Sequence, residues 1–178
     1  MTADIKAVIE GNQIAVFVIQ SQQYSKSMGD ITGVMTKIKE GVCYVSLNKP
    51  CRVIETNLKK SGVSTEKVYF VDAVSSKVGS MEPGGRVIFV SSPQALTELS
   101  IAINKCLGID GIDSVLFDSL STLLVYEGAS SVIKFVHSII NTMRVKDKSC
   151  VFTILKEDLK EEVIKDLGMF ADKIEELT

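Results

Sequence analysis

Short apolar runs alternate along the chain with stretches in which apolar residues recur every three or four positions. The run from Ile14 to Ile19 is continuously apolar, as expected for a strand that is covered on both faces of a sheet. The residues that follow place their apolar side chains on one face of a helix: Met28, Ile31, Val34, Met35 and Ile38. Strands that alternate with helices are typical of βαβ units, so the pattern predicts an α/β domain with a mostly parallel sheet.

The alternation continues to the C-terminus. Further strands are predicted at residues 42–47, 68–72, 86–90, 115–118 and 151–155. Helices are predicted between them, with inward faces that carry Val53, Ile54 and Leu58, then Leu96, Leu99 and Ile103, then Ile133, Val136, Ile140 and Met143. Residues 157–167 are predicted to be helical, and residues 173–178 form either a closing strand or a helix end. Because no repeat or linker interrupts the pattern, we expect residues 1–178 to form a single domain.

Local signals refine these boundaries. Pro50 can open a helix, because its missing N–H would be unpaired in the first turn anyway. Ser92–Pro93 is expected to begin the next helix, and Pro83–Gly84–Gly85 is a predicted turn. The strand at 86–90 follows the third strand too closely for a crossover helix, so its place in the sheet stays open.

The composition excludes several classes of protein. Hydrophobic residues make up 46% of the 178 residues and charged residues 24%, which is typical of a globular protein. The net charge of −2 argues against duplex nucleic acid as the main ligand, because that binding needs a basic face. The apolar runs are far shorter than the ~20 residues of a membrane helix, and no signal peptide is recognised at the N-terminus. We therefore expect a cytoplasmic protein that does not insert into a membrane.

Four cysteines and one histidine offer little metal chemistry. The cysteines are too widely spaced for a zinc site, and buried reduced thiols are the expectation for Cys43 and Cys150. His137 is expected at the surface of its helix. Asp72 ends a predicted strand, where it either caps the following turn or faces a ligand cleft.

The segment after the first strand has the spacing of a phosphate-binding loop. Lys26 and Ser27 follow the strand at the distance expected for the sequence G-x-x-x-x-G-K-[ST], but Gln20 and Ser25 replace its two glycines. Those glycines permit positive φ angles and let backbone N–H groups close around a phosphate. We therefore do not expect a normal phosphate cradle. Lys26 can still reach an anion at the helix N-terminus; the alternative is a solvated Lys26 and a capping Ser27.

The run Val115–Asp118 has the form of a Walker B strand, in which a carboxylate ends an apolar strand. In ATPases that carboxylate helps to hold the magnesium ion of the bound nucleotide. Aspartate is also a common turn residue at strand ends, which is the alternative interpretation of Asp118.

Together, Lys26–Ser27, the strand 42–47 (VCYVSL) and the segment 115–120 (VLFDSL) resemble the RecA superfamily, in particular its KaiC-like branch. The resemblance runs from about Ile14 to the C-terminus, and it favours a strand for the closing segment ADKIEEL. It implies a three-layer RecA-like sandwich with helices on both faces of the sheet. It also implies ATP and magnesium as ligands, with Ser25, Lys26, Ser27 and Asp118 at the nucleotide and Ser27 and Asp118 at the metal ion.

One departure from that family bears on catalysis. KaiC-like ATPases carry acidic residues directly after the Tyr-Val-Ser strand, one of which acts on the attacking water, whereas this chain has Leu47–Asn48–Lys49–Pro50. An amide or an ammonium group cannot serve as the base. We therefore predict a pseudo-ATPase without catalytic residues, which acts in regulation or assembly as a homo-oligomer or with a protein partner.

Three alternatives stay open. The domain retains affinity for ATP and magnesium through Lys26, Ser27 and Asp118 with weak or no hydrolysis, or it is a true ATPase with an unusual base. A flavodoxin-like or receiver-like domain is the alternative fold. Receiver domains need an acidic pair at the end of the first strand, which Ile19–Gln20–Ser21 does not provide.

Overall fold

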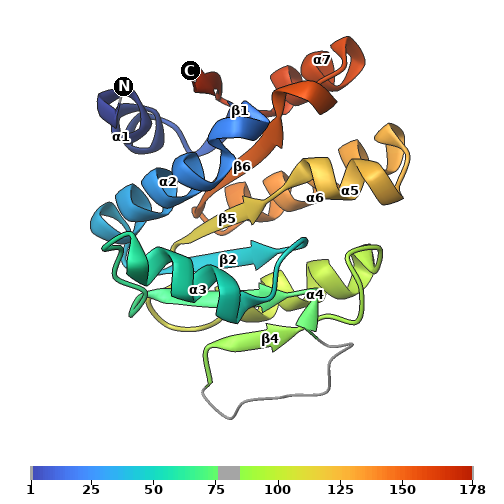
Figure 1. The fold of residues 1–178 in the computed structure, drawn as a ribbon. Helices are drawn as coiled ribbons and strands as arrows, with labels where there is room; N and C mark the ends of the chain where they lie inside the picture. Colours follow the sequence, from blue (N-terminus) through green and yellow to red (C-terminus); the bar gives the residue numbers. More distant parts are fainter. Residues whose placement is uncertain (1, 76–84, 178) are drawn as a thin grey trace.

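The computed structural model describes residues 2–75 and 85–177. These residues form a seven-stranded sheet in the order β4-β3-β2-β5-β6-β1-β7, in which every pair of neighbouring strands is parallel (Figure 1). The strands are β1 (Ile14–Ile19), β2 (Val42–Ser46), β3 (Val68–Asp72), β4 (Val87–Phe89), β5 (Ser114–Asp118), β6 (Ser149–Leu155) and β7 (Lys173–Leu177). The predicted α/β fold is confirmed.

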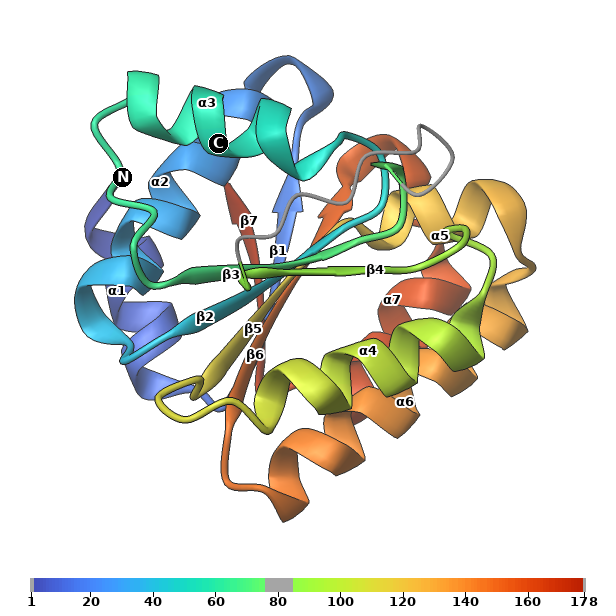
Figure 2. The ribbon, with the colours of Figure 1, turned by 90° about the horizontal axis from the view of Figure 1, so that it is seen from below.

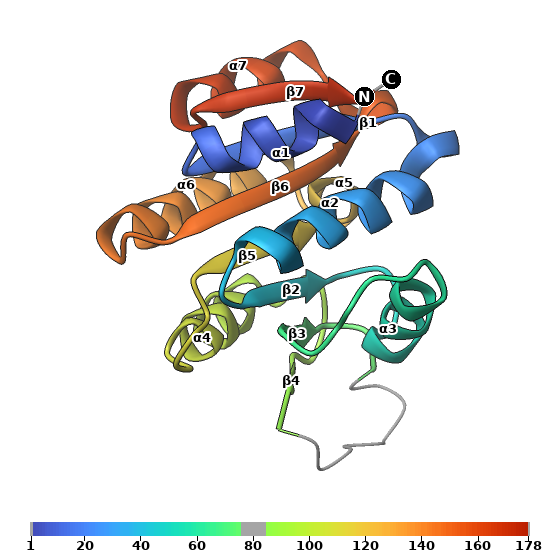
Figure 3. The ribbon, with the colours of Figure 1, turned by 90° about the vertical axis from the view of Figure 1, so that its left-hand side faces the viewer.

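Helices cover both faces of the sheet, which gives the three layers expected of a RecA-like sandwich (Figure 2). One face carries α1 (Thr2–Gly11), α2 (Tyr24–Ile38) and α3 (Cys51–Lys60). The opposite face carries α4 (Leu96–Leu107), α5 (Leu120–Tyr126), α6 (Ala129–Val145) and α7 (Glu161–Phe170). Figure 3 shows α1 and α2 side by side on their face of the sheet.

The two hydrophobic cores explain the continuous apolar runs. Along β1, Ala15, Phe17 and Ile19 pack under α1 to α3. The alternate residues Ile14, Val16 and Val18 pack under the helices of the other face. Because successive side chains of a strand point to opposite faces, a strand covered on both sides must be apolar throughout.

Several boundaries differ from those predicted. The helix expected to begin at Ser92–Pro93 begins at Leu96 instead, because the Ser92 hydroxyl accepts a hydrogen bond from the Gln94 N–H in a turn before it. The helix predicted from residue 157 begins at Glu161, after the 3₁₀ helix η3 (Lys156–Asp158). Strand β4 lies at the edge of the sheet beside β3. Of the predicted turn, Pro83 and Gly84 lie outside the described residues.

Two helices were not predicted. In α1, Ile5, Val8 and Ile9 are buried and have helical spacing, so the signal was present in the sequence. The seven residues of α5 are too few for a periodic pattern.

The cysteines and His137 lie where the sequence predicted them. All four cysteines are free and buried. His137 is exposed, and its ring stacks on Phe170 with 4.2 Å between the ring centroids. Among the helices of residues 2–75 and 85–177, none has both the length and the apolarity that crossing a bilayer requires.

At Gly41, just before β2, the backbone passes close to the turn that precedes β5. A Cβ atom at this position would lie 2.6 Å from the carbonyl oxygen of Gly111 and 2.8 Å from a methyl group of Ile112. We predict that Gly41→Ala lowers the free energy of unfolding by about 1–3 kcal/mol, because the backbone must shift. Chemical denaturation tests this. Gly29→Ala is the matched control, since its Cβ would meet no atom within 4 Å; an equal loss in both variants would contradict the prediction.

Candidate functional site

The candidate site lies where β2 and β5 end side by side, with Ser46 opposite Asp118. The chain leaves β2 toward α3 on one face of the sheet and leaves β5 toward α5 on the other. Such a change of direction opens a crevice at the carboxyl ends of the strands, which is where parallel α/β sheets bind ligands.

Asp118 is the central titratable group of this crevice. Its side chain is 2% exposed, and its Oδ2 atom accepts a hydrogen bond of 2.5 Å from the Tyr44 hydroxyl. Its Oδ1 atom is buried and has no hydrogen-bond partner within the described residues. Burial raises the pKa of Asp118 to about 7 and also raises the pKa of Tyr44. The carboxyl group is therefore partly protonated near neutral pH, and Tyr44 holds one of its oxygens.

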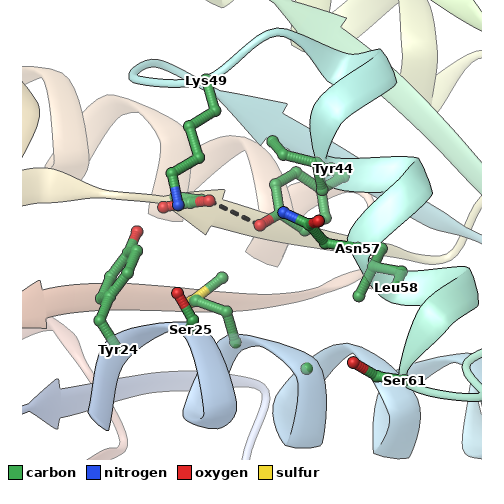
Figure 4. A pocket seen from close by; sticks show the side chains of 11 residues that line it. Tyr24, Ser25, Tyr44, Lys49, Asn57, Leu58 and Ser61 are labelled. Atoms are coloured by element: carbon green, nitrogen blue, oxygen red, sulfur yellow. Dashed lines mark hydrogen bonds between the residues drawn. The ribbon is translucent and has the colours of Figure 1, made fainter. Parts of the chain in front are cut away.

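Two adjoining cavities open around Asp118. The first, the deep pocket, has a volume of about 60 Å³ and lies between α2 and α3 above the ends of β2 and β5 (Figure 4). The second, the edge groove, has a volume of about 350 Å³ and extends over the ends of β1, β5 and β6 toward α5. Tyr24 and Lys49 line both cavities, whereas Asp118 lines only the deep pocket. Of these two cavities, the edge groove is the one that reaches the size of a small-molecule site.

The predicted phosphate loop is compact. Residues Ser21–Gln23 form the 3₁₀ helix η1, and α2 begins directly after it at Tyr24. Gln20, which replaces the first glycine, has a φ of −70°. Outside glycine, Asp147 alone among the described residues has a positive φ. The segment therefore follows ordinary right-handed and extended geometry, and it does not form the strained curve that cradles a phosphate.

The predicted site residues divide into two groups. Ser25 and Asp118 line the deep pocket together. Lys26 is exposed and Ser27 is buried in the first turn of α2, and neither lines the deep pocket or the edge groove. The alternative role of Ser27 as a helix cap is wrong, because Gln23 holds the N-cap position.

The exposed carboxylate of Glu157 binds Ser21, the first residue of η1. The N–H and the hydroxyl of Ser21 donate hydrogen bonds of 3.2 and 2.8 Å to Oε1 of Glu157. Hydrogen bonds from the backbone of Glu157 and from Ser21 hold the pKa of Glu157 below its ordinary value. The chain thus supplies its own anion at the place where the sequence suggested a phosphate.

Lys49 and Tyr44 are the residues that sequence reasoning missed. Lys49 follows β2 and is half-buried, and no ion-pair partner for its ammonium group is found in the described parts of the chain. The position of Lys49 just after a strand at the carboxyl edge was a usable signal. Tyr44 lies inside β2, and only its contact with β5 shows its role.

Asp72 caps the turn after β3, as predicted. It is fully buried and accepts hydrogen bonds of 2.8 Å from the N–H groups of Cys51, Val74 and Ser75, and one of 2.6 Å from the Ser75 hydroxyl. Burial opposes ionisation, but these hydrogen bonds outweigh it and hold the pKa of Asp72 below its ordinary value. Asp72 thereby ties α3 to the end of β3 and does not line either cavity.

The structure does not bring the predicted magnesium ligands Ser27 and Asp118 into one cavity. Tyr44 donates to one carboxyl oxygen, the ammonium group of Lys49 lines the same pocket, and Ser27 lies outside it. Within the described residues, no three histidine, cysteine or acidic side chains gather into a metal site. The assignment of Ser27 and Asp118 as magnesium ligands stays a prediction from the resemblance.

Comparison with known sequences identifies the family. Residues 37–177 match a family described as a family of unknown function, DUF7504. The chain belongs to the DUF7504 family. A comparison of this DUF7504 member with curated proteins found no match.

Solved structures resemble this DUF7504 fold over nearly the whole chain. The KaiC-like protein PH0186 of Pyrococcus horikoshii OT3 is 13% identical with a TM-score of 0.67, and the alignment covers 94% of this chain and 74% of that one. The uncharacterized protein PH0321 of Pyrococcus horikoshii, crystallised with an unknown peptide, is 14% identical with a TM-score of 0.66, covering 92% and 76%. The flagellar accessory protein FlaH of Methanocaldococcus jannaschii is 14% identical with a TM-score of 0.56, covering 96% and 75%. These likenesses establish the RecA-like fold.

Proposed function

We propose that this DUF7504 protein is a single RecA-fold domain that acts in regulation or assembly and does not hydrolyse ATP. The observation that carries the proposal is the compact η1–α2 segment, in which Lys26 is exposed away from both cavities. A triphosphate needs several backbone N–H groups converging on it, and this segment turns directly into a helix.

The loop after β2 supports the absence of hydrolysis. Leu47 is buried, Asn48 is exposed and Lys49 lines the cavities, so no carboxylate follows β2 where a base could act on a water molecule. The acid that lines the deep pocket, Asp118, is buried, and burial raises its pKa to about 7. A chain with neither a phosphate loop nor a positioned base is suited to binding rather than turnover.

Exposed apolar side chains on α4 and α6 support a protein partner. Ile101 is 63% exposed and Val145 is 87% exposed, and the two helices lie next to each other on one face of the sheet (Figure 2). At the edges of the sheet, β7 carries Lys173, Glu175 and Glu176, which discourage strand pairing. A protein partner is also in keeping with PH0321, crystallised with an unknown peptide, and with FlaH, a flagellar accessory protein.

Assembly can be measured directly. We expect light scattering after size-exclusion chromatography to give the mass of a dimer or a larger oligomer, because the exposed side chains of α4 and α6 become buried between copies. Val145→Glu combined with Ile101→Glu should shift the mass to that of a monomer, and Met169→Glu on α7 is the control. A monomeric mass at every concentration, with no complex formed with any partner, would count against the proposal.

The second candidate is a domain that retains ATP and magnesium through Lys26, Ser27 and Asp118. The observation in its favour is the unpaired Oδ1 atom of Asp118 in the deep pocket. Millimolar Mg-ATP at about one hundred times its dissociation constant should then raise the melting temperature by roughly 5–10 °C, and Lys26→Ala should remove that rise. No rise in either protein would leave only the interaction role.

A further inference from the structure

The deep pocket holds polar groups that the fold leaves unpaired. Within the described residues, the Tyr24 hydroxyl and Asp118 Oδ1 are buried without a hydrogen-bond partner. Asp118 itself is 2% exposed, and both residues line the deep pocket. A buried polar group without a partner costs about 1–3 kcal/mol, so each of these two groups calls for a partner such as a ligand or a water molecule.

Lys49 brings a positive charge to the same pocket. Its side chain extends from the loop after β2 into the deep pocket (Figure 4), which Asp118 also lines. The ammonium group stands on a flexible four-carbon stem, so it can contact either side of the boundary between the deep pocket and the edge groove. Lys49 therefore lines both the pocket that contains the buried carboxyl group and the ligand-sized edge groove.

The edge groove offers hydrogen-bond donors and one apolar wall. Ser119, Ser121 and Thr122 contribute hydroxyl groups, and Lys49 and Asp158 are the charged residues among those that line it. Val125 and Tyr126 line the groove from α5 and are 74% and 52% exposed. Hydroxyl groups around a single ammonium suit an anionic group, and the exposed tyrosine suits a flat ring beside it.

We propose that the edge groove binds a small ligand that carries a phosphate group and a flat ring. In this proposal the ligand binds without a divalent metal ion, and the ammonium group of Lys49 supplies the positive charge. In ATP-binding enzymes a magnesium ion neutralises the phosphate charge and is held by a carboxylate at a strand end. Here we expect the Lys49 ammonium, which lines both cavities, to contact the phosphate in place of a metal ion. The inference rests on the proposed loss of hydrolysis, because a site without metal and base binds a phosphate ester without cleaving it.

The test uses ADP as the probe, with excess EDTA and no added metal. We expect calorimetry to detect ADP binding under these conditions, and we expect millimolar ADP to raise the melting temperature. Lys49→Ala should weaken binding about 10- to 100-fold, the loss of one charge-assisted hydrogen bond, and Lys49→Arg should retain part of the affinity. Lys60→Ala, at the exposed end of α3, is the matched control, and the melting temperature of each free variant verifies that it is folded.

Each outcome decides the inference. Metal-independent binding that requires Lys49 supports it. Binding that requires magnesium and Lys26, or no binding of ADP at millimolar concentration, overturns it. Absence of ADP binding leaves the proposed regulatory or assembly role intact, whereas magnesium-dependent cleavage of ATP would overturn both.

Discussion

Replacing Asp118 by asparagine should flatten the dependence of stability on pH between about pH 4 and pH 7. Burial raises the pKa of Asp118 in the folded protein to about 7, whereas an aspartate in an unfolded chain titrates near pH 4. The folded protein therefore binds the proton more tightly, and the stability that this proton contributes is lost as the pH rises toward 7. The difference corresponds to as much as about 4 kcal/mol.

Urea denaturation at a series of pH values from 4 to 8 measures this effect. The natural protein should lose stability across this interval relative to Asp118→Asn, whose amide cannot ionise. The quantity compared is the slope of the free energy of unfolding against pH. The absolute stability is not compared, because the new amide nitrogen is also buried and changes it. Asp110→Asn, at an exposed turn, should leave the slope unchanged. Equal slopes for the natural protein and Asp118→Asn would show that folding does not raise the pKa of Asp118.

Asp72→Ala should lower the free energy of unfolding at pH 7 by about 3–5 kcal/mol. The substitution removes four hydrogen bonds and leaves the N–H groups of Cys51, Val74 and Ser75 without their acceptor. The pH dependence has the opposite sign to that of Asp118. The pKa of Asp72 is lowered, so its stabilisation is present above about pH 4 and is lost as the pH falls through its folded pKa.

Chemical denaturation of three variants distinguishes how much the charge of Asp72 and how much its hydrogen-bonding side chain contribute to stability. Asp72→Asn keeps one acceptor oxygen and should lie between the natural protein and Asp72→Ala. Asp166→Ala on α7 is the control and should change stability by less than about 1 kcal/mol. If Asp72→Ala were no less stable than Asp166→Ala, Asp72 would not hold α3 to the end of β3.

The strands were the most predictable part of the fold. Continuous apolar runs such as Ile14–Ile19 can only be buried on both faces, and this requirement led directly to a parallel sheet under two layers of helices. Helix starts were less predictable, because Ser92 serves a turn before α4 and not the helix itself. The seven residues of α5 carry too little periodicity to be recognised.

The candidate site was predictable in its location and less so in its composition. The ends of the strands pointed to Asp118, which lies in the crevice as expected. The sequence could not show that Tyr44, 74 positions away, donates to Asp118, because the order of the strands sets that contact. For the same reason the sequence favoured Lys26, which has the spacing of a phosphate-binding loop. The loop after β2 instead brings Lys49 into both cavities.

We propose that this RecA-fold domain has lost the means to hold and cleave a triphosphate. A single-turnover experiment tests it most directly, with protein in excess over γ-labelled Mg-ATP and with Asp118→Ala measured in parallel. We predict that phosphate appears no faster than in buffer alone. Phosphate release that rises with protein concentration and disappears in Asp118→Ala would contradict the account.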